Sequence, residues 1–169
     1  TPGWSSPPQL ADPLTTQVAA HLARFTRFTS GDIVFAWTGG NDFLIQSRDL
    51  GLSLITPTTA VTNMATAGTE LADLIKTQIV ANGATRVVAM TLPDPGVTPD
   101  YSASPPETKA FLTQMTTAYN GALIAGLAGT NVRIIDVGAY LADVVARPAA
   151  YGFVNSSQGA CDPAKIPPA

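Results

Sequence analysis

The chain contains one cysteine and one histidine among its 169 residues. Cys161 has no second cysteine in this chain with which to form a disulfide, and an odd cysteine indicates a free thiol or a partner elsewhere. It is a poor candidate for a nucleophile, because no histidine follows it and His21 lies far upstream. His21 itself could act as a general base, but a histidine within a helix is more often structural. Stability must therefore come from a hydrophobic core, and a chain of this length can bury roughly 70% of its unfolded surface.

Charge and long apolar runs are also scarce. Charged residues make up 12% of the chain and the net charge is -3, so no basic field exists to hold nucleic acid, and we expect no nucleic-acid partner. No apolar run approaches the roughly 20 residues that span a bilayer, and no segment has the basic-then-apolar pattern of a signal peptide. We therefore expect no transmembrane segment. Because the sequence opens at Thr1 without an initiator methionine, we expect a cleaved or truncated chain.

The motifs of several familiar chemistries are missing. The sequence has no Gly-x-Gly-x-x-Gly, no Walker loop, no His-Glu helix for zinc and no Cys-x-x-Cys. The Gly-x-Ser-x-Gly nucleophile motif is absent as well. Its nearest match, over residues 3–7, has no strand before it. These absences lead us to expect neither a metal nor a cofactor.

Helical and strand patterns alternate along the chain. Such an order predicts an α/β fold, in which a parallel sheet lies between layers of helices. The strand segments are continuously apolar, which predicts burial on both faces by helices above and below. The expected elements are helix 14–28, strand 33–37, helix 42–48, helix 57–82, strand 86–90, helix 106–128, strand 132–136 and helix 139–146.

Three strands make a small sheet, since five or six are typical. Either further strands are missing from this chain or a second copy completes the sheet edge. No internal repeat and no domain boundary is visible, so we expect residues 1–169 to form a single, incomplete domain.

The most informative segment is the turn after the first expected strand, Trp37 to Phe43. In parallel sheets, ligands bind outside the carboxyl ends of the strands. Gly39 and Gly40 would let the backbone turn sharply and approach a ligand closely, and Asn41 adds a side-chain amide. The alternative is an ordinary turn into a helix, with Asp42 as its side-chain cap.

Three segments resemble the SGNH (GDSL-type) esterases and lipases. Residues 39–42 (Gly-Gly-Asn-Asp) look like the family's Gly-x-Asn-Asp block. Residues 92–99 (Leu-Pro-Asp-Pro-Gly-Val-Thr-Pro) are similar to the Leu-Pro-Pro-Leu-Gly-x-Thr-Pro segment of its lipase-like branch. Residues 151–155 (Tyr-Gly-Phe-Val-Asn), ahead of a cysteine, resemble its Tyr-Gly-Phe-x-Asn segment. The three occur in the family's order and spacing.

The resemblance implies an activity and a site. In that family the asparagine amide helps to form the oxyanion hole, which implies this catalytic role for Asn41, with Gly39 in the same turn. Gly40, Phe43 and Leu92 are candidates for substrate binding. Phe43 and Leu92 would form the apolar wall of an acyl pocket, or else belong to the ordinary core. The implied fold is the flavodoxin-like three-layer α/β/α domain, and the implied protein is a secreted or cell-surface bacterial hydrolase of acyl esters.

Other blocks of the family have no counterpart here. The sequence lacks a Gly-Asp-Ser-Leu-like block, the glycine block that normally precedes a segment like residues 1–13, and Asp-x-x-His after Cys161. The resemblance thus covers residues 14–162 as a central piece, without N-terminal strands and the C-terminal catalytic loop. It implies that the serine and histidine lie on a missing segment or a second chain, and that Cys161 pairs with a cysteine in the absent tail. We expect residues 1–169 alone not to hydrolyse esters.

Two other functions remain open. The chain could be a noncatalytic flavodoxin-like module that holds a small ligand between the turn at Gly39 and the proline-rich loop at Pro93. It could also be an interaction domain that uses the edge of its incomplete sheet, since an unpaired edge recruits strands.

Overall fold

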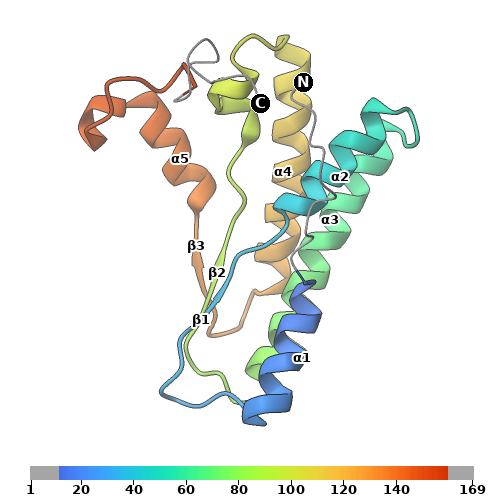
Figure 1. The fold of residues 1–169 in the computed structure, drawn as a ribbon, viewed down its shortest axis with the longest axis vertical. Helices are drawn as coiled ribbons and strands as arrows, with labels where there is room; N and C mark the ends of the chain where they lie inside the picture. The colour runs from blue at the N-terminus through green and yellow to red at the C-terminus, as the bar shows by residue number, and fades with distance from the viewer. Residues whose placement is uncertain (1–11, 160–169) are drawn as a thin grey trace, which may run out of the picture.

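The computed structural model describes residues 12–159, which form a mixed α/β domain (Figure 1). The sheet has three parallel strands in the order β1-β2-β3. The elements are α1 (Leu14–Phe25), β1 (Val34–Ala36), α2 (Gly40–Gly51), α3 (Pro57–Leu74), a π-helical segment (Ile75–Val80), β2 (Val87–Met90), 3-10 turns at Pro95–Val97 and Pro99–Tyr101, α4 (Pro106–Gly126), β3 (Arg133–Ile135), α5 (Val137–Ala146) and a 3-10 turn at Pro148–Tyr151.

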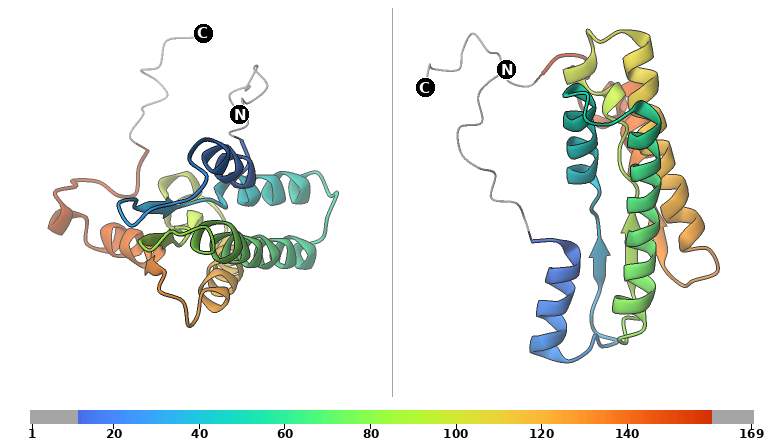
Figure 2. Two further views of the ribbon diagram at one scale, coloured as in Figure 1. Left: turned by 90° about the horizontal axis from the view of Figure 1, so that it is seen from below. Right: turned by 90° about the vertical axis from the view of Figure 1, so that its right-hand side faces the viewer.

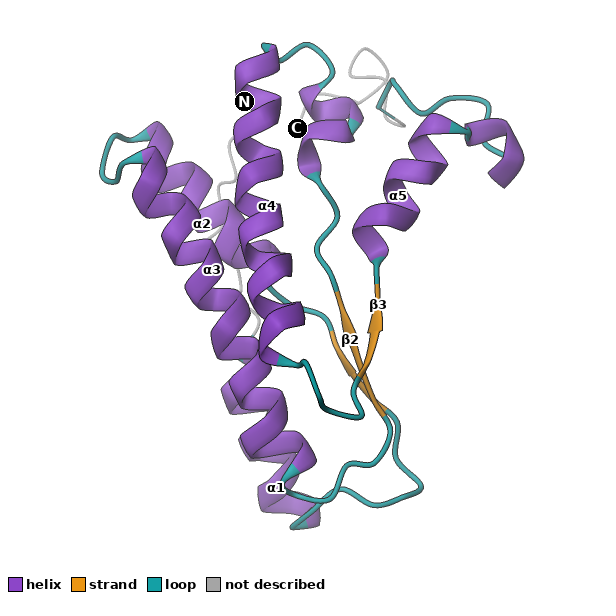
Figure 3. Ribbon diagram, turned by 180° about the vertical axis from the view of Figure 1, so that it is seen from behind, coloured by secondary structure: helices purple, strands orange, loops and turns teal. Residues whose placement is uncertain are grey.

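The strand order decides where the crossover helices lie. From β1 to β2 and from β2 to β3 the chain moves across the sheet in the same direction. Right-handed crossovers therefore place α3 and α4 on the same face. Figures 1 and 3 show both helices on one side of the strands, with α5 running on from β3 away from them. The predicted parallel α/β architecture is confirmed to this extent.

The core lies between the sheet and this single helix layer. Its largest fully buried side chains include Met64 and Ile75, Met115 and Tyr119. Two glycines allow α3 and α4 to approach closely. A Cβ at Gly68 would lie 2.3 Å from the Tyr119 carbonyl oxygen, and one at Gly126 would lie 2.6 Å from the Cβ of Ala72. The helix pair thus packs nearly backbone to backbone.

The strands are covered on one face only, so the prediction of burial on both faces is wrong for residues 12–159. Ala36, Val87 and Ala89 are buried under the helices. On the other face, Phe35 is 61% exposed and Ile135 is 41% exposed. The continuous apolar runs predict the strands correctly. They do not show whether the helices that cover the second face of the sheet belong to this chain. The expected second helix layer is not found among the described residues.

Several element boundaries also differ from the predicted ones. The strands are shorter by one or two residues at their ends, and α2 is longer than the expected helix 42–48 because it begins at Gly40 and continues to Gly51. The prolines of the loop after β2 do not exclude helical geometry. Pro95 and Pro99 each open a 3-10 turn, since proline has a helical φ and the first turn needs no N–H.

Helix α1 lies at the amino-terminal end of the strands, far from α2 (Figure 2). His21 on α1 stacks on Phe28, with ring centroids 4.2 Å apart, and contacts Phe25. This environment gives His21 a packing role. Within residues 12–159, no helix combines the length and apolar character needed to cross a bilayer.

Replacing Gly68 by alanine should destabilise the domain, because the new methyl would meet backbone rather than a movable side chain. We expect the free energy of unfolding of the 169-residue chain to fall by about 2 kcal/mol, as for other overpacked sites. Urea denaturation followed by circular dichroism measures this change.

Gly121→Ala is the matched control, since this glycine lies in the neighbouring helix α4 with nothing within 4 Å of an added Cβ. It should raise stability by about 0.5–1 kcal/mol through helix propensity alone. Equal effects at Gly68 and Gly121 would contradict the close packing of α3 and α4.

Candidate functional site

The Tyr119 side chain packs against the turn that connects β1 to α2. The phenolic hydroxyl donates a hydrogen bond to the Thr38 carbonyl oxygen at 2.8 Å. Burial raises the pKa of Tyr119 well above its ordinary value, and the nearby Asp42 carboxylate raises it further. The phenol therefore remains protonated, and the hydrogen bond persists across the physiological pH range.

Gly39 is required at this turn for two reasons. Its φ is +103°, in the left-handed region that favours glycine. A Cβ at this position would also lie 2.5 Å from the Tyr119 ring. Gly39 is buried and serves as the N-cap residue of α2. Gly39 thus forms the buried side of the turn, and the next two residues, Gly40 and Asn41, are exposed to solvent.

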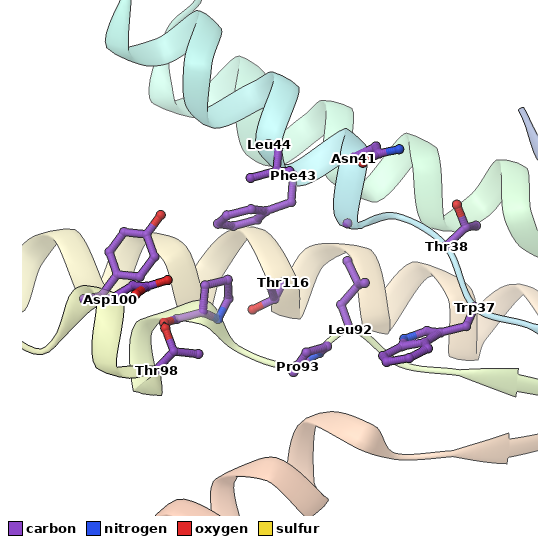
Figure 4. A pocket seen from close by; sticks show the side chains of 13 residues that line it. Trp37, Thr38, Asn41, Phe43, Leu44, Leu92, Pro93, Thr98, Asp100 and Thr116 are labelled. Atoms are coloured by element: carbon purple, nitrogen blue, oxygen red, sulfur yellow. The ribbon is translucent and has the colours of Figure 1, made fainter. Parts of the chain in front are cut away.

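Asn41 lies in the first turn of α2, at the carboxyl end of β1. In Figure 4 its side chain points away from Leu92 and Thr116. Leu92 follows β2, which is the only neighbour of β1 within the described sheet, so the amide points away from the end of β2. No side chain caps α2, so the expected alternative in which Asp42 caps this helix is wrong. Asp42 instead lies inside the first turn, where a carboxylate favours the helix dipole.

The loop after β2 is fixed by Asn120, the residue next to Tyr119 on α4. The Asn120 side chain accepts a hydrogen bond from Leu92 N at 2.8 Å and donates one to Leu92 O at 2.9 Å. Its amide thus pairs with the backbone of Leu92 as a neighbouring strand would. Adjacent residues of α4 thereby hold the ends of two adjacent strands.

Between α2 and this loop lies a cavity of about 560 Å³. It is lined by the predicted residues Gly40, Asn41, Phe43 and Leu92 (Figure 4). Phe43 is 5% exposed and Leu92 is 7% exposed. Further lining comes mainly from Trp37, Leu44, Pro93, Pro95, Tyr101 and Thr116. The structure brings these predicted residues together around one largely apolar cavity, with Gly39 directly beneath the turn.

The sequence pattern gave no role to Tyr119, Asn120 or Thr116. All three lie in the helix expected over residues 106–128, and Thr116 is 3% exposed. The available signal was the presence of hydrogen-bonding groups on the buried side of an otherwise apolar helix. Sequence alone does not reveal which backbone groups such side chains meet.

At the end of β3 the polar groups satisfy one another. The Asp136 carboxylate accepts hydrogen bonds from the Thr91 hydroxyl at 3.0 Å and from Ala139 N at 2.9 Å. Thr91 in turn accepts one from Gly138 N at 3.1 Å. These bonds cap α5 and join β3 to β2, and they leave Asp136 a structural carboxylate.

The third segment of the family resemblance lies beside α5. Tyr151 donates a hydrogen bond to the Asp143 carboxylate, which also pairs with Arg147. The Arg147 hydrogen bonds, followed by that of Tyr151, hold the pKa of Asp143 below its ordinary value. These contacts fold the chain back after α5. Cys161 lies outside the described residues, so its predicted pairing stays a prediction.

Among residues 12–159, the cavity presents no serine beside a histidine; its polar lining besides Asn41 consists of threonines, Tyr101 and Asp100. Its lining contains neither histidine nor cysteine, and His21 lies on α1 at the other end of the sheet (Figure 2). The described residues also contain no group of three or more potential metal-ligating side chains. The site within this part of the chain thus offers a side-chain amide and a largely apolar cavity with a few hydroxyl groups and one carboxylate at its lining.

No family model matches this chain, and no curated protein matches it.

Tyr119→Phe tests the support of the turn, because it removes the hydroxyl and keeps the ring beneath Gly39. The Thr38 carbonyl loses its donor, so we expect the free energy of unfolding to fall by about 1–2 kcal/mol. Urea denaturation measures the loss, and amide hydrogen exchange should quicken at residues 39–43.

Tyr140→Phe is the control, since Tyr140 is 59% exposed on α5. It should change stability by less than about 0.5 kcal/mol. Unchanged hydrogen exchange at residues 39–43 in Tyr119→Phe would show that the turn does not depend on this bond.

Proposed function

We propose that this chain belongs to an SGNH-type serine esterase and supplies the oxyanion-stabilising amide, Asn41, and an apolar wall of the acyl pocket. The catalytic serine and histidine are proposed to come from outside residues 1–169, on another segment or a second chain. The substrate would be a small-molecule or lipid acyl ester. The observation that carries the proposal is the placement of Asn41, exposed in the first turn of α2 at the carboxyl end of a parallel strand and beside an apolar cavity.

The free edge of β1 leaves room for another segment, which could place a nucleophile near the exposed Asn41 amide. Only β2 lies beside β1 within the described sheet. A further parallel strand paired along this edge would end close to Asn41, since carboxyl ends of parallel strands meet on one side of a sheet. A serine at the end of that strand would lie beside the amide. The proposed complete fold is the flavodoxin-like three-layer domain, with such a strand and a second helix layer.

In the proposed reaction, the serine hydroxyl attacks the ester carbonyl carbon while the histidine takes its proton. Negative charge moves to the carbonyl oxygen, which accepts a hydrogen bond from the Asn41 amide. The tetrahedral intermediate then collapses, and the alcohol leaves with the proton from histidine. Water repeats these steps on the acyl-serine and releases the acid.

The rigid turn supports this role for the amide. An oxyanion donor is effective when it is held in place before charge develops, so that little reorganisation is needed. The Tyr119 hydrogen bond to Thr38 and the restricted Gly39 fix the backbone from which Asn41 projects. A single donor of this kind contributes about 3–4 kcal/mol to transition-state stabilisation.

The cavity beside the turn supports the acyl-binding role. Phe43 and Leu92 are buried on its lining, and the exposed Trp37 adds an aromatic surface. The volume of about 560 Å³ lies within the usual range for small-molecule sites. The same cavity favours the second candidate function, noncatalytic binding of a small apolar ligand. A secreted or cell-surface bacterial location belongs to the esterase proposal and follows from the family resemblance alone.

The proposal is tested on the protein as isolated from its source, with any partner chain retained. A fluorophosphonate should label a serine outside residues 1–169, and Asn41→Ala should lower kcat for a nitrophenyl butyrate ester by about 10²–10³ with little change in KM. The purified 169-residue chain should show no turnover.

Asn131→Ala is the matched control, because this asparagine is exposed at the opposite end of the sheet, before β3. It should leave kcat unchanged. Absence of any labelled serine, with fatty acid still bound by the chain, would replace the esterase with the binding function. Turnover by the purified chain would show that the nucleophile lies within it.

A further inference from the structure

The cavity between α2 and the loop after β2 is negative at one end. Asp100 is the only charged residue of the lining, which holds no lysine, arginine or histidine of residues 12–159. Figure 4 shows Asp100 and Trp37 at opposite ends of the cavity. Phe43 and Leu92 lie between them. The cavity thus joins a largely apolar stretch to a single carboxylate.

The Asp100 carboxylate is available to a ligand. Asp100 is exposed and takes part in none of the ion pairs formed within residues 12–159. Lys109 is the only lysine or arginine between residues 87 and 132, and its ammonium donates a hydrogen bond to the Ser102 carbonyl oxygen at 2.8 Å. Within the described residues, Asp100 therefore has no counter-charge paired with it.

Two aromatic rings line the cavity toward this carboxylate. Tyr101 follows Asp100 directly in the chain, lines the cavity and is partly buried against the core. In Figure 4, Phe43 lies on the Asp100 side of Leu92. Aromatic faces attract ammonium groups through the ring quadrupole, and the attraction grows when water is excluded. A carboxylate beside aromatic rings is therefore a favourable place for an organic cation.

The backbone of the loop that carries Asp100 is restrained. Pro99 opens a 3-10 turn, and Tyr101 N donates a hydrogen bond to the Thr98 carbonyl oxygen at 3.1 Å. The Thr98 hydroxyl donates in turn to the Pro95 carbonyl oxygen at 2.7 Å. These local hydrogen bonds fix the backbone at Asp100 before any ligand arrives.

The charge and the apolar walls together select the ligand. A cavity with one sign of charge and low-dielectric walls concentrates ions of the opposite sign. A chain that ends in a carboxylate would be repelled at Asp100. A purely apolar chain end would cover the Asp100 carboxylate without giving it a partner, which is costly. An ammonium group at the chain end avoids both penalties.

We propose that the cavity binds a molecule in which a short apolar chain carries an ammonium group at its end. The chain would lie against Phe43 and Leu92, and the ammonium would pair with Asp100 beside Tyr101. As a statement about the substrate, this inference rests on the proposed esterase function: the carbonyl would then lie near Asn41, and the acyl chain would end in the ammonium. The preference for a cation itself does not require the serine.

The test uses three probes with the same chain length and different end groups: hexylammonium, hexanol and hexanoate. Nuclear magnetic resonance titration of the 169-residue chain should show hexylammonium binding about three- to tenfold more tightly than hexanol, as expected for a partly exposed ion pair with a cation–π contact. Hexanoate should bind more weakly than hexanol. The amide signals that shift should belong to Phe43, Leu92 and Tyr101.

Asp100→Asn should make hexylammonium and hexanol bind equally, because it removes the charge and keeps the shape. Glu70→Gln is the matched control, since this exposed carboxylate on α3 lies outside the cavity lining and its loss changes the net charge by the same amount. It should leave the preference for hexylammonium unchanged. Equal affinities for hexylammonium and hexanol in the unaltered chain, or a preference that survives Asp100→Asn, would overturn the inference.

A second measurement separates this failure from that of the esterase function. On the protein as isolated from its source, the nitrophenyl ester of ω-aminohexanoate should show a KM about three- to tenfold lower than that of the hexanoate ester. A labelled serine without this difference would refute the cation preference alone. Hexylammonium binding without a labelled serine would refute the esterase function and leave the cation preference standing.

Discussion

Tyr119 is the residue on which the arrangement of the domain depends. Its backbone carbonyl faces Gly68, one of the two positions where a glycine lets α3 and α4 approach closely. Its ring lies beneath Gly39, and its hydroxyl donates to the Thr38 carbonyl at the end of β1. One residue on α4 thus contributes both to the packing of the helix pair, through its backbone, and to the shape of the strand-to-helix turn, through its side chain. A shift of α4 relative to the sheet would therefore also move the turn that carries Asn41.

The neighbouring residue extends this control to the second strand. Asn120 pairs with both backbone groups of Leu92, so consecutive positions on α4 hold the ends of β1 and β2. The positions of these two strand ends, on either side of the cavity, are therefore set by one helix. Preorganisation of this kind suits a site whose donors must be in place before a ligand or a developing charge arrives.

The two faces of the sheet have different roles. One face forms the core with α3 and α4, and its buried residues are small, such as Ala36 and Ala89. The other face presents Phe35 and Ile135 to solvent, with cations at its amino-terminal end. The site proposed for chemistry lies at the carboxyl ends of the strands. A second helix layer on this exposed face would complete the cover that a parallel sheet requires.

The sequence by itself determined the alternation of helices and strands, the parallel sheet, and the turn at Gly39, because these depend on local periodicity and on the conformational freedom of glycine. It also indicated that Gly40, Asn41, Phe43 and Leu92 belong to one end of the sheet, since carboxyl ends of parallel strands meet. Only the tertiary structure decided that Tyr119 and Asn120 support this site, because a hydrogen bond across 81 or 28 residues leaves no local pattern. It also decided that one face of the sheet stays open, since an apolar strand looks the same in sequence whether its own chain or a partner covers it.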